Sequence, residues 1–233
     1  MVNNWFKFIQ GRLFPPTCIL CDDSGFDHKD ICTACYADLM LNTVHCRRCA
    51  TPLISKADHR QLCGQCLKKP PRYQQVSAPF LYQHSMRWLI TGLKFHRQIK
   101  NAHLLGQLFV DNVPHDHPLP DFIVPVPLHP KRYRERGFNQ SQEIATTVAR
   151  QLGVPLHLTL CRRIKYTPPQ SLLHAKQRHK NIRNAFSVSA FPQGSNIVIF
   201  DDVMTTGATV SELVKVLKQA GAGNVWIWVC ARA

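Results

Sequence analysis

The sequence has no apolar run that approaches the ~18–20 residues needed to cross a membrane. Its first residues, MVNNWFKFIQGRLF, lack an uninterrupted apolar core and a small-residue cleavage site, so we expect no signal peptide. Charged residues make up 18% of the chain and hydrophobic residues 45%, which excludes a disordered or collagen-like protein. We therefore expect a globular cytoplasmic protein without stable membrane insertion.

Acidic residues are scarce. The 233 residues include 29 Lys and Arg but only 14 Asp and Glu, which gives a formal net charge of +15. Twelve of the basic residues lie between residues 130 and 183, where the only acidic residues are Glu135 and Glu143. A positive excess of this kind is typical of proteins that bind phosphate groups or nucleic acid, and also of a solvated basic surface.

The ten cysteines are unevenly distributed, because eight of them form C-x-x-C pairs within residues 18–66. The pairs are Cys18/Cys21, Cys32/Cys35, Cys46/Cys49 and Cys63/Cys66. A tetrahedral zinc site takes two such pairs, so the spacing predicts two four-cysteine sites. Sequential pairing is favoured, and interleaved pairing stays open. Disulfides, a redox motif and iron–sulfur ligation are the alternatives, of which disulfides are disfavoured in a reducing cytosol.

The zinc should be structural, because four thiolate ligands leave no coordination position for a catalytic water. The cysteine-rich segment has few apolar residues, and metal binding should therefore supply much of its folding energy. A Lys-Lys-Pro-Pro-Arg stretch at residues 68–72 is typical of a linker. We predict a double zinc ribbon with a short N-terminal helix over residues 1–70 and a second domain over residues 71–233.

The second domain is expected to be α/β, since alternating strands and helices are typical of a parallel sheet with helices packed against it. Strands are predicted over residues 76–83, 122–126, 156–163, 185–188, 197–200 and 225–230. Helices are predicted over residues 84–112, 140–152 and 209–220, with a basic loop after Val126.

The most informative segment is IVIFDDVMTTGAT, residues 197–209. A predicted strand ends at Asp201 and Asp202, at the edge where open α/β sheets bind ligands. Hydroxyl residues and Gly207 follow and open a helix, an arrangement whose backbone N–H groups bind phosphate. The carboxylates, which we expect to face solvent, suit the hydroxyls of a diol. The segment predicts a site for a phosphorylated sugar; P-loop and Rossmann signatures are absent, and a capped turn without a ligand is the alternative.

This segment resembles the phosphoribosyl pyrophosphate (PRPP) motif of type I phosphoribosyltransferases. The whole chain resembles the ComF/GntX family of competence-associated proteins, on FPPTC with the four C-x-x-C pairs, LKF (93–95), VPVPL (124–128), RERGFNQ (134–140) and TPPQS (167–171). The resemblance implies a double zinc ribbon and a phosphoribosyltransferase-like parallel sheet with helices on both faces. It also implies a role in natural transformation or DNA uptake, with a DNA-uptake helicase or other competence proteins as partners.

The resemblance also implies residue roles. Asp201 and Asp202 would be the catalytic carboxylates that hold the ribose hydroxyls. The 5-phosphate would bind to the turn, and the pyrophosphate, with Mg²⁺ as template and Lewis acid, would bind to basic residues after Val126. The turn residues are Thr205, Thr206, Gly207, Ala208 and Thr209, and the basic residues are Lys131, Arg132 and Arg136. The stretch between Leu160 and Phe186 would form a mobile flap.

One PRPP molecule uses only part of this positive charge. Basic residues interleaved with aromatic ones are typical of single-stranded nucleic-acid surfaces. The candidates here are Arg162, Arg163, Lys165 and Arg178, and a solvated flap is the alternative. Two functions follow from the sequence: a phosphoribosyltransferase with an unidentified acceptor, and a non-catalytic PRPP-sensing protein that binds single-stranded DNA.

Overall fold

The centre of the molecule is a parallel β-sheet. The structure, a computed structural model, describes residues 15–54, 61–113, 119–166 and 182–233. The strands follow the order β1-β7-β6-β3, and β2 also pairs with β7; every pair in this sheet is parallel. The strands are β1 (Val76–Ser77), β2 (Phe80–Leu81), β3 (Phe122–Pro125), β6 (Ile197–Met204) and β7 (Val225–Arg232).

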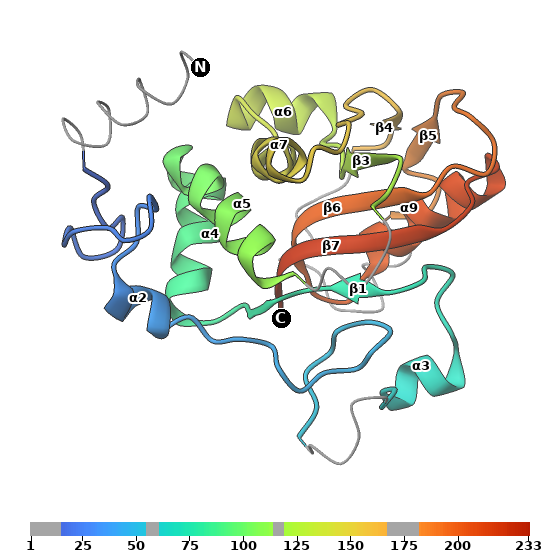
Figure 1. Ribbon diagram of the computed structural model, residues 1–233. Coiled ribbons are helices and arrows are strands. Elements are labelled where there is room, and N and C mark those ends of the chain that lie inside the picture. Colours follow the sequence, from blue (N-terminus) through green and yellow to red (C-terminus); the bar gives the residue numbers. More distant parts are fainter. Residues whose placement is uncertain (1–14, 55–60, 114–118, 167–181) are drawn as a thin grey trace.

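Helices cover both faces of this sheet, as Figure 1 shows. One face carries α4 (His84–His96), α5 (Lys100–Asn112) and α7 (Gln140–Leu152), and the other carries α9 (Ala208–Gln219). Successive side chains of β6 point to opposite faces of the sheet. Val198 and Phe200 therefore pack in the first buried cluster, with α4, α5 and α7, and Ile197 and Ile199 pack in the second, with α9. The predicted α/β fold with helices on both faces is confirmed.

Three predicted elements differ from those observed. The predicted strand 76–83 is two short strands, because Pro79 between them has no N–H to donate to a ladder. The predicted helix 84–112 is two helices, separated at Arg97, whose φ of 53° ends α4. Of the predicted strand 156–163, only β4 (Cys161–Arg163) forms, and it pairs antiparallel with β5 (Phe186–Val188) outside the main sheet.

The predicted basic loop is the helix α6 (Pro130–Arg136). Pro130 stands in its first turn, where a missing N–H costs nothing. The His129 side chain caps it by accepting a hydrogen bond from the Lys131 N–H, and Gly137, at φ 90°, ends it. The sequence lacked an apolar periodicity here because no residue of α6 is buried.

The two predicted zinc-binding parts, the first ribbon (residues 15–41) and the second ribbon (residues 42–72), lie against different sides of the molecule. They contain the short helices α2 (Thr33–Ala37) and α3 (Gly64–Lys68). Figure 1 shows α2 beside α4 and α3 beyond β1. Each ribbon contributes residues to one of the two buried clusters, so both share a core with the sheet domain. The domain boundary at residue 70 and the N-terminal helix stay predictions, the helix because residues 1–14 lie outside the described part.

Among the described residues, no helix is long and apolar enough to span a membrane.

Candidate functional site

The eight paired cysteines form two compact groups. Cys18, Cys21, Cys32 and Cys35 make the first, Cys46, Cys49, Cys63 and Cys66 make the second, and within each group the sulfur atoms lie within 4.8 Å of one another. The predicted sequential pairing is therefore confirmed, and each group fits a structural zinc site with four thiolate ligands.

Backbone N–H groups point at several of these sulfur atoms. The Cys63 N–H donates to Cys46 Sγ over 3.2 Å, and the Cys35 N–H donates to Cys32 Sγ over 3.4 Å. Burial opposes ionisation of Cys46, but such hydrogen bonds outweigh it and lower the pKa of its thiol to about 7. Because the thiolate is the form that binds a metal, these N–H donors favour the zinc-binding form of Cys46, whereas burial and the neighbouring sulfur atoms raise the pKa of Cys49 and Cys66.

Asp201 and Asp202 lie within β6, not beyond its end. Pro125 of β3 pairs with Phe200, so from Asp201 onward β6 has a ladder partner only in β7. Strand β3 ends at Pro125, so the side of β6 that carries the carboxylates has no neighbouring strand beyond Phe200. This is the C-terminal edge at which parallel sheets bind ligands.

The N-terminus of α7 contacts both carboxylates. The Ser141 hydroxyl donates to Asp201 Oδ1 over 2.8 Å, and Gln140 Nε2 donates to Asp202 Oδ1 over 3.3 Å. Asn139 holds this end of α7 in place, since its side chain accepts from the Ser141 N–H and donates to the Val126 carbonyl. The helix N-terminus adds a favourable dipole to the negative charge of the pair.

Lys94 of α4 forms an ion pair with Asp202, whose side chain is only 2% exposed. The expectation that both carboxylates face solvent is therefore wrong for Asp202. Burial, with the adjacent Asp202 charge, raises the pKa of Asp201 to about 7, and Lys94 and the Ser141 hydrogen bond oppose this rise. Lys94, together with Arg136 and Arg163 at longer range, offsets the charge of the two adjacent carboxylates.

The turn between β6 and α9 needs glycine at its end. Gly207 has φ of 73°, and a Cβ placed there would stand 2.5 Å from Met204 Cε. Thr205 and Thr206 are exposed, and α9 begins at Ala208. The turn thus presents exposed threonines at the positive end of a 12-residue helix, an arrangement that suits a phosphate group.

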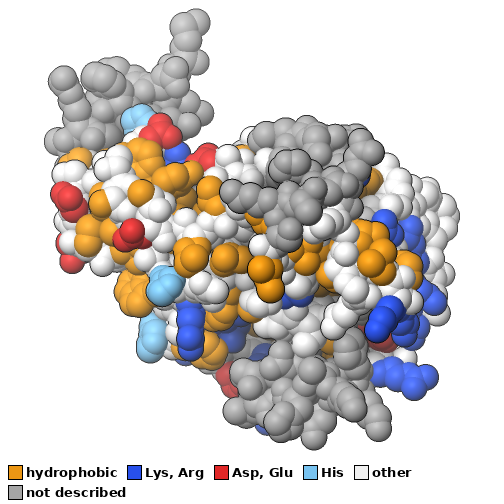
Figure 2. Space-filling model, turned by 90° about the horizontal axis from the view of Figure 1, so that it is seen from below, with side chains coloured by type: hydrophobic (Ala, Val, Ile, Leu, Met, Phe, Trp, Pro, Cys, Tyr) orange, Lys and Arg blue, Asp and Glu red, His pale blue; other side chains and the backbone are white. Residues whose placement is uncertain are grey.

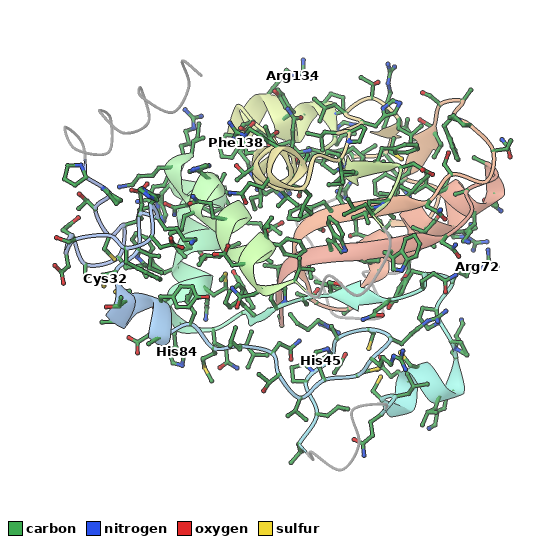
Figure 3. All side chains as sticks on the ribbon, viewed as in Figure 1. Cys32, His45, Arg72, His84, Arg134 and Phe138 are labelled. Carbon is green, nitrogen blue, oxygen red and sulfur yellow. The ribbon has the colours of Figure 1, made fainter. Side chains whose placement is uncertain are left out.

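The helix α6 brings positive charge to this edge. Arg136 donates a hydrogen bond to Gln140 Oε1 and interacts electrostatically with Asp202 and with Arg132. Lys131 is exposed, with its Nζ 4.7 Å from the ring centroid of Tyr166. Arg134 lies on the outer side of the helix (Figure 3).

The four residues predicted to contact nucleic acid differ in their surroundings. Arg162 and Lys165 are exposed. Arg163 is partly buried, interacts electrostatically with Asp201 and Arg132, and places its guanidinium 5.8 Å from the Phe186 ring centroid. Arg178 lies outside the described residues. Arg163 therefore belongs with the carboxylate pair rather than with an outer surface.

Sequence reasoning gave no role to Lys94, Gln140 or Ser141, which contact the carboxylates. Lys94 and Gln140 do lie in segments that carried the family resemblance. The only local signal was a lysine between apolar neighbours at Leu93 and Phe95, and its partner is more than 100 positions away along the chain.

Comparison with known proteins agrees with this arrangement. The double zinc ribbon domain family matches residues 9–67, and the phosphoribosyl transferase domain family matches residues 139–232. The chain is 36% identical to the DNA utilization protein YhgH of Salmonella typhi over 225 residues, which cover 94% of this chain and 97% of that protein. It is 32% identical to competence protein F of Haemophilus influenzae over 226 residues, covering 93% and 96%.

Among solved structures, the chain is similar to the adenine phosphoribosyltransferase from Thermoanaerobacter pseudethanolicus, with 14% identity and a TM-score of 0.38 over 59% of this chain and 83% of that one. The two domain matches and the relatives confirm the resemblance to the competence-associated proteins. The chain therefore belongs to the family of DNA utilization and competence proteins that join a double zinc ribbon to a phosphoribosyltransferase domain.

Proposed function

We propose that this protein binds PRPP with Mg²⁺ at the open end of β6 and transfers its phosphoribosyl group to an acceptor that is still to be identified. The observation that carries the proposal is the carboxylate pair Asp201 and Asp202. A few residues further along the chain, the exposed turn at the start of α9 suits a phosphate group. A phosphorylated sugar with free hydroxyls is complementary to this juxtaposition. The match to the phosphoribosyl transferase domain family supports it.

Each part of PRPP has a candidate partner. The ribose hydroxyls would donate to Asp201 and Asp202, and the 5-phosphate would bind the N–H groups and hydroxyls of the 205–209 turn. Lys131, Arg132 and Arg136 would neutralise the pyrophosphate. Carboxylate oxygens suit Mg²⁺, which would supply Lewis-acid and templating chemistry with the pyrophosphate. Departure of pyrophosphate leaves positive charge on the sugar, so positioning and electrostatics carry the catalysis.

The hairpin of β4 and β5 is proposed as the base of a flap over this site. Its strands pair antiparallel at Cys161–Val188 and Arg163–Phe186, which brings the two ends of the intervening segment together. Arg163 of this hairpin interacts electrostatically with Asp201. Residues 167–181, which make up most of the predicted flap, lie outside the described part of the chain.

The test is calorimetric titration of the zinc-loaded protein with PRPP in the presence of Mg²⁺. Asp201→Asn should weaken binding at least tenfold, about the loss expected for a hydrogen bond to a charged group. Asp38→Asn, an exposed carboxylate in the first ribbon, is the matched control and should bind as the parent does. Equal affinity of the parent and the Asp201→Asn variant would reject the assignment.

A pyrophosphate-release assay, run with and without single-stranded DNA, then separates an enzyme from a sensor. Release of pyrophosphate with a candidate acceptor supports the transferase. PRPP binding without release over a panel of acceptors supports the sensing function.

A second function, binding of single-stranded DNA, is favoured by the exposed surface next to the site. Arg162, Lys165 and Tyr166 are exposed on the β4 side, and Tyr133 and Arg134 are exposed on α6. Positive charge beside aromatic rings suits the backbone and bases of a single strand. The names of the relatives, DNA utilization protein and competence protein, support a role connected with DNA. Action in the cytoplasm on incoming DNA, with an uptake helicase or other competence proteins as partners, is part of this proposal.

A further inference from the structure

Arg232, the last residue of β7, connects the phosphate-type turn to the second cysteine group. Its side chain is buried, with only 8% of the residue exposed. Nη1 donates to the Met204 carbonyl over 2.7 Å and also to the Thr205 carbonyl. Nε donates to the Cys49 carbonyl over 3.2 Å, and Nη2 donates to the Thr51 hydroxyl over 2.9 Å. One guanidinium therefore bonds the backbone of the turn and the backbone of a predicted zinc ligand.

The Thr51 hydroxyl extends this connection to the sulfur. Thr51 Oγ1 lies 3.1 Å from Cys49 Sγ. A guanidinium has only donors, so the hydroxyl accepts from Arg232, and its single proton is free to donate to the sulfur. A thiolate is the better acceptor, and zinc holds Cys49 as a thiolate. With Cys49 bound to zinc as a thiolate, Thr51 would be the donor in this contact, and a continuous chain of hydrogen bonds would run from Arg232 through Thr51 to Cys49.

The bonds from Arg232 also set the direction of the N–H groups that are proposed to bind a phosphate. In a trans peptide the carbonyl and the following N–H point in opposite directions, and the described chain contains no cis peptide. Holding the carbonyls of Met204 and Thr205 toward Arg232 therefore turns the N–H groups of Thr205 and Thr206 away from it. These residues are exposed, at the edge where the phosphate is proposed to bind.

The first cysteine group has different neighbours. Cys18 and Cys32 belong to the buried cluster that includes residues of α4 and α5. Cys46, Cys49 and Cys66 belong to the cluster that includes Met204 and Ala208, on either side of the turn. The first group therefore provides an internal control.

We propose that Arg232 and Thr51 are positioning residues that couple the second zinc site to the phosphate-binding turn, so that zinc at this site favours binding of the sugar phosphate. The identity of the ligand rests on the proposed function, whereas the coupling of the turn to the metal site does not. Because coupling between two sites is reciprocal, binding of the ligand should in turn raise the affinity of the second cysteine group for zinc.

The first test measures hydrogen exchange of residues 203–209 in the zinc-loaded full chain without ligand. Thr51→Val removes the hydroxyl and keeps the shape, and exchange in the turn should accelerate about tenfold, the size expected from the loss of one hydrogen bond to a charged group. Thr51→Ser keeps the hydroxyl and should exchange at the parent rate. If the Val and Ser variants exchange alike, the relay is overturned.

Arg232→Lys provides an independent variant should Thr51→Val fold poorly. It keeps the charge but cannot bond both the turn and the second ribbon, because an ammonium lacks the planar fork of a guanidinium. Faster exchange confined to the turn is expected, and parent exchange rates in the turn would overturn the coupling.

The second test follows release of zinc to a chelator, with and without PRPP and Mg²⁺. Cys21→Ser, which removes an exposed ligand of the first group, identifies the phase that belongs to the second zinc. PRPP should slow this phase about tenfold in the parent and in Thr51→Ser, a usual size for coupling between two sites, but not in Thr51→Val. PRPP that binds without slowing either phase contradicts the coupling. If PRPP does not bind while the Val and Ser variants still differ in exchange, the coupling stands and the proposed function fails.

Discussion

The two ribbons have the same metal ligands but opposite charge. The first ribbon contains five aspartates, one lysine and no arginine, whereas the second contains seven Lys and Arg and one aspartate. Figure 2, which views the molecule from below, shows Asp and Glu side chains mainly at the left end of this face and a group of Lys and Arg side chains at the right end. Two groups built from the same C-x-x-C pairs therefore lie in different electrostatic surroundings.

The ribbons also differ in how they are attached to the sheet domain. Lys29 of the first ribbon pairs with Asp111 of α5 over 3.2 Å, which ties that ribbon to the helical layer. The second ribbon is tied to the phosphate-type turn through Arg232. Ligand spacing therefore determines where metal binds, but the neighbours of each group determine what the metal supports.

Loss of one whole metal site should give the largest effect. Cys18→Ser and Cys46→Ser should each lower the zinc content from two ions to one per chain, since each removes a buried ligand from one group. Binding of a structural zinc contributes on the order of 10 kcal/mol in small zinc domains, so local unfolding is expected. Hydrogen exchange should accelerate in α4 and α5 for Cys18→Ser and around the turn for Cys46→Ser.

Elemental analysis and limited proteolysis provide the control for these two variants. Native folding of the metal-free protein would contradict the structural role of zinc. Identical exchange maps for the two variants would remove the distinction between the ribbons.

The helical layer next to the first ribbon also contributes a charge to the proposed ligand site, because Lys94 of α4 forms an ion pair with Asp202. Asp202→Asn would leave Lys94, only 21% exposed, without its anionic partner. Removing one member of a buried pair costs about 3 kcal/mol, so denaturant unfolding should show a loss of this order. Lys94→Met combined with Asp202→Asn removes both charges and should recover part of the loss. A single Asp202→Asn variant as stable as the parent would show that the pair does not matter for folding.

The sequence predicted what local chemistry specifies and missed what tertiary packing supplies. The cysteine pairs, the carboxylates and Gly207 were found because their chemistry depends on neighbours within a few residues. Lys94, Ser141 and Arg232 reach the site from α4, α7 and β7, and no local pattern marks such convergence. The helix α6 was missed for another reason: it is stabilised by its ends and has no buried face that would give a periodic signal.

A pH titration of stability tests the surroundings of Asp201. Burial and Asp202 raise the pKa of this carboxyl from 3.8 to about 7, so between these pH values the folded state binds a proton that the unfolded state does not. Stability contributed by this proton is present at low pH and is lost as the pH rises toward 7. Asp201→Asn should remove this loss, so the melting temperature of the ligand-free variant, relative to the parent, should increase from pH 5 to pH 8. A constant difference between the two proteins would contradict the raised pKa.

The smallest expected effect concerns the basic surface on β4 and α6. It tests whether single-stranded DNA binds there and away from the acidic first ribbon. Each phosphate contact on a single strand contributes about −0.7 to the log–log salt slope, so four contacts give about −3 and a roughly fifty-fold loss of affinity from 50 to 200 mM salt.

Reversing the exposed Arg162 and Lys165 to Glu should remove about two contacts and reduce the slope to roughly −1.4. Arg163 is left unchanged because it interacts electrostatically with Asp201, so PRPP binding and zinc content should match the parent. Asp22→Asn with Asp23→Asn, on the acidic ribbon, should leave the slope as it is if strands bind away from that end. An unchanged slope in the Arg162 and Lys165 variant would make this face a solvated part of the flap, and the transferase would then account for the charge.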